Sequence, residues 1–222
     1  MLILNFQDGW SKEIIIVNDG SKDKTFDIMK DLAKKFPEVK IFENERNMGK
    51  TQTVKNGLLK TKGDVVVIQD ADFEYYPEEI PTLLEKMIKE SLDVVYGNRF
   101  GKKNKVIYWK NYYGNRFLSA FSNLFTYPRI KTWIPDMEVC YKMVNGDIFR
   151  ELAKTIESKS TFGLEPEVTA KLSKYKKDGK HLKFGIIAIS YKPRTIEEGK
   201  KMHAFKDGSK ALFEILKFNL FK

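Results

Sequence analysis

The chain has 222 residues, of which 40 are lysine or arginine and 30 are aspartate or glutamate, and its formal net charge is +10. A single cysteine excludes an internal disulfide, and two histidines far from it argue against a His/Cys metal site or a Ser-His-Asp triad. No apolar run approaches the ~18 residues needed to cross a bilayer. The length suits one domain, 1–222, with a substantial core.

The charge is unevenly distributed along the chain. Residues 1–100 carry 15 basic and 18 acidic side chains, a net charge of −3, whereas residues 101–222 carry 25 and 12, a net charge of +13. A basic second half suits an anionic acceptor, an anionic membrane surface or nucleic acid. We therefore expect the two halves of the domain to contact different partners.

Short β-branched runs alternate with amphipathic helical patterns over the first hundred residues. This alternation predicts strands at 13–17, 39–43, 64–69 and 92–96, and helices at 23–36, 50–61 and 78–90. Strands that alternate with helices are typical of βαβ units. The sequence therefore predicts an α/β fold whose mostly parallel sheet is flanked by helices.

The first predicted strand runs into a polar turn at 18–23. Gly20 permits a tight turn or a positive φ, and Ser21 or Asp23 can cap the helix that follows. Asp19 is left at the strand tip, where it can accept hydrogen bonds from ribose or base groups. An ordinary strand-to-helix turn is the alternative interpretation.

Two carboxylates separated by one residue, Asp70 and Asp72, follow the third predicted strand, and Glu74 lies two residues further on. In open α/β sheets, ligands bind just beyond the carboxyl ends of the strands. Hard oxygen ligands at this spacing suit Mg²⁺ or Mn²⁺, which keeps its remaining positions for water and phosphates. A solvated acidic turn is the alternative.

After residue 100 the pattern becomes basic and aromatic. Lysines alternate with tyrosines and a tryptophan over 102–113, and an apolar helical face follows over 117–125. The C-terminal segment, 205–222, repeats this combination of apolar residues and lysines in an amphipathic helix. Such stretches can lie at a membrane interface, and core-packing helices with solvated lysines are the alternative.

Together these motifs resemble those of family 2 glycosyltransferases with the GT-A (Rossmann-like) fold. The turn at 17–23 is similar to the family's nucleotide-binding turn, 47–50 to its Asn-X-Gly-Lys/Ala loop, and 70–72 to its metal-binding Asp-X-Asp. Five further segments resemble the polyprenyl-phosphate hexose synthase branch, in the order 96–100, 136–138, 162–167, 191–194 and 198–201. The resemblance covers nearly the whole chain.

The resemblance implies an inverting transferase that moves a hexose from GDP-mannose or UDP-glucose to a polyprenyl phosphate, such as a dolichyl or undecaprenyl phosphate. Residues 1–100 would bind the nucleotide sugar and 101–222 the acceptor, and a divalent cation would assist. The implied roles are donor binding by Asp19, Gly20, Ser21, Lys50 and Asp70; metal binding by Asp70, Asp72 and Glu74; acceptor-phosphate binding by Arg99, Arg116, Arg194 and Lys200; and catalysis by Asp72, Arg99 and Asp136.

Two alternatives to this function remain open. A saccharide or other hydroxyl acceptor would make Asp136 the catalytic base. A basic module that binds nucleic acid or a membrane surface without catalysis would keep the same fold. On the main interpretation we expect no nucleic-acid partner, a peripheral position on the cytosolic face of a membrane, and possibly a membrane-anchoring subunit as in some relatives.

Members of the resembled family begin with a strand that carries a Pro-X-X-Asn-Glu type loop over the nucleotide base. Nothing before Glu13 supplies that loop, and residues 1–11 look like the tail of the helix that would follow it. We therefore expect a sheet without its first strand. Such a sheet would expose the edge of a neighbouring strand and could weaken nucleotide binding.

Overall fold

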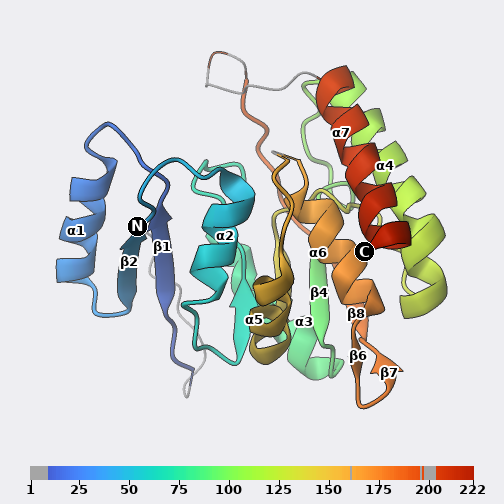
Figure 1. Ribbon diagram of the computed structural model, residues 1–222, viewed down its shortest axis with the longest axis horizontal. Helices are drawn as coiled ribbons and strands as arrows, with labels where there is room; N and C mark the ends of the chain where they lie inside the picture. The colour runs from blue at the N-terminus through green and yellow to red at the C-terminus, as the bar shows by residue number, and fades with distance from the viewer. Residues whose placement is uncertain (1–9, 161, 196, 198–203) are drawn as a thin grey trace.

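The structure is a computed structural model that describes residues 10–160, 162–195, 197 and 204–222. Helices surround strands in an α/β arrangement, and the N-terminal elements lie at the left of Figure 1 and the C-terminal helices at the right. The expected α/β fold with a mostly parallel sheet is confirmed. Lys200 and the rest of the 198–201 motif lie outside the described residues.

The first four elements match the predicted order to within a few residues. They are β1 (Ile14–Asn18), α1 (Thr25–Lys35), β2 (Val39–Glu43) and α2 (Lys50–Leu58). β1 and β2 are parallel, and α1 packs mainly on β2 while α2 packs on β1. Short helices and strands with clear periodicity thus formed where local pattern alone predicted them.

The second sheet has four strands in the order β3-β5-β4-β8. These strands are β3 (Val65–Val67), β4 (Val94–Asn98), β5 (Lys142–Asn145) and β8 (Phe184–Ala188). β5 is antiparallel to both β3 and β4, whereas β4 and β8 are parallel. β5 was not predicted, because a four-residue strand that begins with a lysine and ends with an asparagine has no apolar run.

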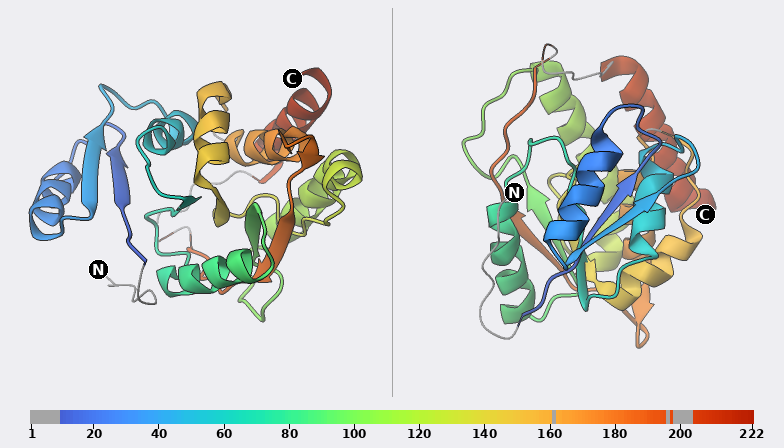
Figure 2. Two further views of the ribbon diagram at one scale, coloured as in Figure 1. Left: turned by 90° about the horizontal axis from the view of Figure 1, so that it is seen from below. Right: turned by 90° about the vertical axis from the view of Figure 1, so that its left-hand side faces the viewer.

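The two sheets are not joined in the part of the chain that the structure describes. No described strand pairs with the free edge of β1 or of β3, and Figure 2 shows the two groups of strands side by side. Parallel strands are normally buried on both faces, yet the apolar residues of β1 remain partly exposed. This partial exposure is what an interrupted sheet produces.

Helix α2 links the two parts through polar side chains that contact the second half. Lys55 Nζ donates to the carbonyl oxygen of Ile156 at 2.7 Å, and Thr51 Oγ1 to that of Ser160 at 3.3 Å. Both acceptors lie in the loop after α5 (Gly146–Thr155). Helix α2 is therefore fixed to a loop of the second half.

The hydrophobic core lies between the four-stranded sheet and the helices that pack around it. Those helices are α3 (Ile80–Lys89), preceded by the 3-10 turn η1 (Pro77–Glu79), then α4 (Trp109–Ile130), α5, α6 (Leu164–Lys174), α7 (Ala204–Leu216) and the π-helical η2 (Lys217–Phe221). A hairpin of β6 (Lys176–Lys177) and β7 (Lys180–His181) precedes β8. Val94, Tyr96, Phe149, Val168 and Ile215 are among the fully buried residues that unite these elements.

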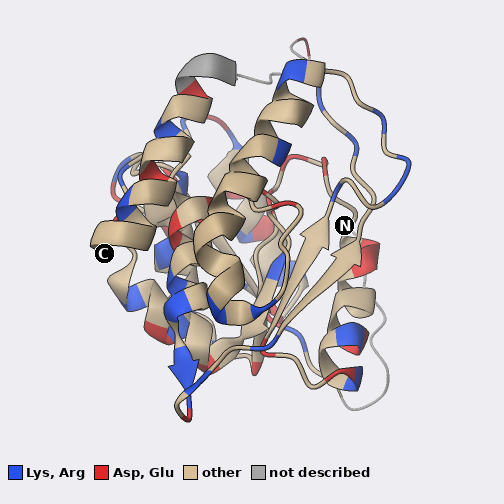
Figure 3. Ribbon diagram, turned by 90° about the vertical axis from the view of Figure 1, so that its right-hand side faces the viewer, with Lys and Arg blue, Asp and Glu red and all other residues tan. Residues whose placement is uncertain are grey.

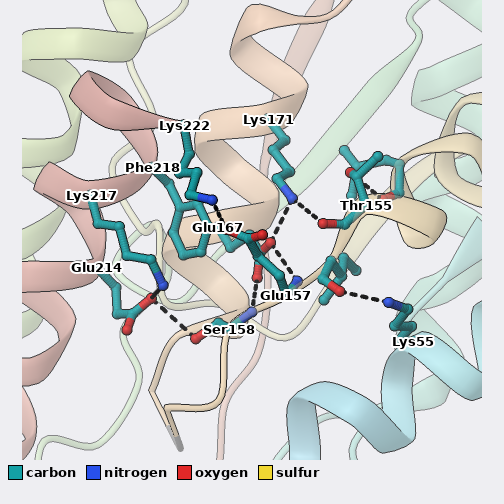
Figure 4. A network of polar contacts seen from close by, with 12 residues as sticks. Lys55, Thr155, Glu157, Ser158, Glu167, Lys171, Glu214, Lys217, Phe218 and Lys222 are labelled. Carbon is teal, nitrogen blue, oxygen red and sulfur yellow. Dashed lines mark hydrogen bonds and ion pairs between the residues drawn. The ribbon is translucent and has the colours of Figure 1, made fainter.

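A polar network holds α7 against α6 and the loop between α5 and α6 (Figure 4). The fully buried Glu167 accepts from the backbone N–H groups of Glu157 and Ser158 at 2.8 and 2.9 Å, and from Lys171 Nζ at 2.6 Å. Ser158 Oγ in turn donates to Glu214 on α7 at 3.1 Å. A buried carboxylate with three donors is well compensated, so this network fixes the loop at 156–160.

Candidate active site

The candidate site lies beyond the carboxyl ends of β1 and β3, beside the first turns of α2 and α6. The loop after β1 supplies Asp19, the loop after β3 supplies Asp70 and Asp72, and α2 and α6 supply Lys50 and Glu165. Residues from four separate segments therefore meet at one edge, as expected for a ligand site in an open α/β sheet.

Asp19 is engaged by the loop that precedes α2. Its carboxylate accepts from the backbone N–H groups of Met48 and Gly49 at 2.8 and 2.9 Å and from Asn44 Nδ2 at 2.8 Å. Burial would raise the pKa of Asp19, but these donors outweigh it and lower the pKa. In this structure Asp19 shapes the loop at 44–49 rather than projecting a free acceptor.

Gly20 makes the close approach of these two loops possible. Its φ is +71°, and a Cβ at this position would lie 2.8 Å from the backbone nitrogen of Asn47. Only glycine fits this conformation without strain. Ser21 donates its backbone N–H to Asn18 Oδ1 at 3.2 Å and leaves its own side chain exposed.

Lys50, the first residue of α2, bridges two carboxylates. Its Nζ lies 2.9 Å from Asp70 Oδ2 and 2.9 Å from Glu165 Oε1. Burial opposes the charge of Lys50, but the carboxylates of Glu165 and Asp70 outweigh it and raise the lysine pKa well above its ordinary value. Lys50 is therefore a fixed cation beside the first residue of the Asp-X-Asp pair.

Asp72 is paired with an arginine from a distant segment. Its Oδ2 lies 3.0 Å from Arg194 Nη2, and its Oδ1 accepts from the backbone N–H of Glu74 at 3.2 Å. Burial, together with repulsion from Glu74 and Asp70, raises the pKa of Asp72 despite the arginine. These closely spaced carboxylates concentrate negative charge. Asp70 and Asp72 are therefore suitable ligands for a divalent cation.

Glu74 does not join this pair as a third ligand in the structure. Its Oε1 accepts from the backbone N–H of Arg194 at 2.9 Å and lies 3.6 Å from that residue's Nε. Within the described residues, no three His, Cys, Asp or Glu side chains converge as a metal site. In the structure the Glu74 carboxylate holds the segment after β8, and its place in the metal ligand set stays a prediction.

Arg99 and Asp136 form a buried bidentate pair. Arg99 Nε and Nη2 donate to the two oxygens of Asp136 at 2.7 Å each, and the Arg99 backbone N–H adds a bond of 3.0 Å. Asp136 is fully buried, and the guanidinium also lies over the ring of Tyr191 at 5.1 Å. The structure thus pairs these two side chains with each other, and catalysis by Asp136 and phosphate binding by Arg99 stay predictions.

The two other described arginines predicted to bind the acceptor phosphate differ in their surroundings. Arg116 is exposed on α4, where its guanidinium lies over the rings of Phe100 and Tyr112. Arg194 is held by Asp72 and Glu74. Of the three arginines predicted to bind the acceptor phosphate, Arg116 is therefore the one without a carboxylate partner among the described residues.

Two further ionisable residues lie near the site, and of these only Glu138 was part of a motif in the sequence. Lys142 on β5 is buried, donates to the carbonyl oxygens of Met137 and Val139, and has a pKa lowered by burial although Glu165 and Glu138 oppose that shift. Glu138 has a buried Oε1 without a partner among the described residues, and burial with the charge of Glu165 raises its pKa to about 8. Its acidic motif was visible in the sequence, whereas a buried lysine in a strand resembles a surface residue.

Comparisons with known proteins give the site a context. The family model described as "Glycosyl transferase family 2" matches residues 4–153. The dolichol-phosphate mannosyltransferase of Pyrococcus furiosus is 37% identical over 108 residues, which are 49% of this chain and 30% of that protein. An uncharacterised glycosyltransferase of Bacillus subtilis, YkcC, is 36% identical over 98 residues, which are 44% of this chain and 30% of that protein. The matched part of this chain thus spans less than a third of either relative.

Solved structures with a similar fold include two synthases. Glucosyl-3-phosphoglycerate synthase from Mycobacterium tuberculosis, in complex with Mn²⁺, UDP and glucosyl-3-phosphoglycerate, gives a TM-score of 0.62 at 16% identity, with 96% of this chain and 70% of that chain covered. Mannosyl-3-phosphoglycerate synthase from Rubrobacter xylanophilus gives 0.61 at 14% identity, with 93% and 62% covered. These likenesses establish the GT-A fold.

We expect Arg99→Ala to destabilise the protein by about 3–5 kcal/mol, because it leaves the buried Asp136 carboxylate without its partner. Arg116→Ala, which removes an exposed arginine, should change stability by less than about 0.5 kcal/mol. Urea unfolding monitored by circular dichroism measures both. A small loss of stability in Arg99→Ala together with a large loss of substrate binding would instead identify Arg99 as a substrate ligand.

We expect Glu138→Gln to remove a pH dependence of stability. The pKa of Glu138 is raised from 4.5 to about 8 in the fold. The stability that the protonated side chain contributes is therefore complete below pH 4.5 and is lost as the pH rises through about 8. The wild type should therefore lose stability relative to the variant from about pH 4.5 to 8, and the difference should level off above. Urea unfolding at a series of pH values measures it.

The exposed Glu78 gives the control for this series, since Glu78→Gln should follow the wild type throughout. Parallel curves for Glu138→Gln and the wild type would show that Glu138 ionises in the fold as readily as in the unfolded chain.

Proposed function

The chain belongs to glycosyltransferase family 2, and from that membership we propose that it moves a hexose from a nucleotide sugar to a polyprenyl phosphate. GDP-mannose or UDP-glucose would be the donor, and Mg²⁺ or Mn²⁺ at Asp70 and Asp72 would assist. The matching relative from Pyrococcus furiosus is a dolichol-phosphate mannosyltransferase, which supports this choice of acceptor. One GT-A domain would comprise a donor half, 1–100, and a basic acceptor half, 101–222.

The observation that carries the proposal is the crowded carboxylate pair at the end of β3. Asp70 and Asp72 lie beyond the carboxyl end of a strand, where ligands bind in open α/β sheets. Lys50 and Arg194 offset their charge. When bound there, a divalent cation would offset the charge that develops on the departing nucleoside diphosphate. The Mn²⁺ and UDP in the complex of the M. tuberculosis synthase support the same cofactor and ligand class here.

The chain's own residues would position the two substrates. Asp19 holds the loop at 44–49 in place, and Gly49 is the N-cap of α2, whose first N–H groups can face phosphate oxygens. The acceptor phosphate is ionised near neutral pH and therefore needs positioning more than a base. Arg116 is the best placed arginine for that task, since Arg99 is committed to Asp136.

A hydroxyl acceptor would require a general base. Asp136 is a poor candidate, because Arg99 occupies both of its carboxylate oxygens. The geometry therefore favours a phosphate acceptor, which needs no base. Activity with a saccharide would instead direct attention to Glu138, whose Oε1 has no partner among the described residues.

We also propose that α4 contacts an anionic membrane surface on its cytosolic side, either directly or beside a membrane-anchoring subunit. An exposed apolar face runs along this helix and comprises Trp109, Tyr113, Phe117, Leu124 and Tyr127. The loop before it carries the exposed Lys102, Lys103 and Lys105, seen as the blue segments that lead into α4 in Figure 3. Exposed aromatic residues next to lysines suit the headgroup region of a bilayer.

Among the described residues, no helix is both long and apolar enough to cross a bilayer.

We expect the protein to transfer radiolabelled hexose from one of the two donors into an organic-extractable polyprenyl phosphate with Mn²⁺, and to lose that transfer in EDTA. Asp72→Asn should reduce the rate by at least about a hundredfold, because it removes a charged metal ligand. Arg116→Ala should raise the KM for the lipid phosphate more than it lowers kcat.

Asp31→Asn is the matched control, since Asp31 is an exposed aspartate on α1 with no predicted role in the site. Full transfer by Asp72→Asn in EDTA would contradict the metal role. Label in a saccharide but not in lipid would establish the hydroxyl acceptor instead.

We expect the protein to float with vesicles that contain anionic lipids and to float less with neutral ones. Phe117→Ser combined with Leu124→Ser should reduce flotation severalfold, because both side chains are more than half exposed on α4. Ile28→Ser is the matched control, since Ile28 is equally exposed on α1 at the other end of the molecule. Equal loss in the control would contradict a specific role of α4.

A further inference from the structure

We propose that Lys50 and Arg194 are internal counter-ions of the Asp70/Asp72 pair, which a divalent cation displaces when it binds. This inference rests on the proposed metal site and concerns what occupies the two carboxylates before the metal arrives. Each carboxylate has its own basic partner. The two partners come from opposite halves of the chain.

Lys50 offsets Asp70 from the donor side. Its Nζ lies 2.9 Å from Asp70 Oδ2, which is an oxygen that a metal ion would need. The same Nζ lies 2.9 Å from Glu165 Oε1. A displaced Lys50 therefore keeps a carboxylate partner, and moving it away from Asp70 does not strand its charge.

Arg194 offsets Asp72 from the acceptor side. Its Nη2 lies 3.0 Å from Asp72 Oδ2, and its Nε lies 3.6 Å from Glu74 Oε1. The backbone N–H of Arg194 is separately bound to Glu74 at 2.9 Å. Glu74 can therefore keep the segment after β8 in place while the guanidinium leaves Asp72.

A metal ion and these two cations cannot share the carboxylates without repulsion. Both basic groups are within 3.0 Å of the oxygens that a metal would bind, so a divalent ion there would be a near neighbour of two positive charges. Asp70 and Asp72 can bind either the basic side chains or the metal ion. When the metal binds, Lys50 keeps Glu165 as a partner and Arg194 keeps Glu74. The arrangement is thus built to exchange one cation for another.

One consequence is an order of binding. Metal at Asp72 frees the guanidinium of Arg194, which can then bind an anionic acceptor bidentately. Because such coupling is reciprocal, the metal and an anion at Arg194 would each tighten the binding of the other. This exchange gives Arg194 its predicted role as a phosphate ligand only after the metal is bound.

The test is the affinity for Mn²⁺ alone, measured from the electron paramagnetic resonance signal of the free ion. We expect Lys50→Met and Arg194→Met each to bind Mn²⁺ roughly fivefold tighter or more than the wild type, in the range of couplings between neighbouring sites. The double variant should bind tighter than either, and Asp72→Asn should bind much more weakly. Lys89→Met is the matched control, since Lys89 is an exposed lysine on α3 with no part in the site.

Thermal unfolding supplies a second measurement that also checks folding. In EDTA, Lys50→Met and Arg194→Met should unfold at lower temperature than the wild type, because a carboxylate has lost its partner. Added Mn²⁺ should raise their unfolding temperature more than it raises that of the wild type, as expected for tighter binding to the folded state.

Unchanged or weaker Mn²⁺ binding in both single variants, with wild-type binding that depends on Asp72, would overturn the exchange and leave the metal site intact. Binding that no variant alters, Asp72→Asn included, would overturn the metal site as well. If the wild type binds no Mn²⁺ at millimolar concentration, binding gained by the double variant supports the exchange, and its absence overturns both.

Discussion

The crowding of carboxylates at the carboxyl end of β3 is the constraint on which the rest of the site depends. Asp70, Asp72 and Glu74 follow one short strand within five positions, and Glu165 approaches from α6. So much negative charge in a partly buried place is unfavourable unless cations offset it. Lys50 and the segment after β8 are held where they are because they supply those cations, and a divalent ion would meet the same requirement.

A second layer of charge lies behind the first and is more deeply buried. The Arg99–Asp136 pair closes on itself through two hydrogen bonds of 2.7 Å, so it fixes the loop before β5 and leaves no free charge. Lys142 extends this layer with bonds to two carbonyl oxygens of the same loop. Within the acidic motif Asp136 is thus paired internally, whereas Glu138 retains an unpaired oxygen among the described residues.

The difference between what the sequence predicted and what it missed follows from the range of the interactions. The strands up to β4 and their helices depend on periodicity over about ten residues, and they form within a few residues of the predicted places. The position of Asp70 and Asp72 at a strand end is equally local. The pairing of Arg99 with Asp136 joins residues 37 positions apart, and that of Arg194 with Asp72 joins residues 122 positions apart. Residue type alone could not decide whether those arginines would meet a substrate or a carboxylate.

The C-terminal half also contacts the N-terminal half, although the two sheets share no hydrogen bonds among the described strands. Glu167 and Glu214 fix the loop at 156–160, and the carbonyl oxygens of that loop accept hydrogen bonds from Thr51 and Lys55 on α2. Helix α2 begins with Lys50, so the position of this lysine relative to Asp70 is set in part by α7, more than 150 residues away in the sequence. These polar contacts, together with the packing of Leu58 in the shared core, link α2 to the second half although the sheet does not.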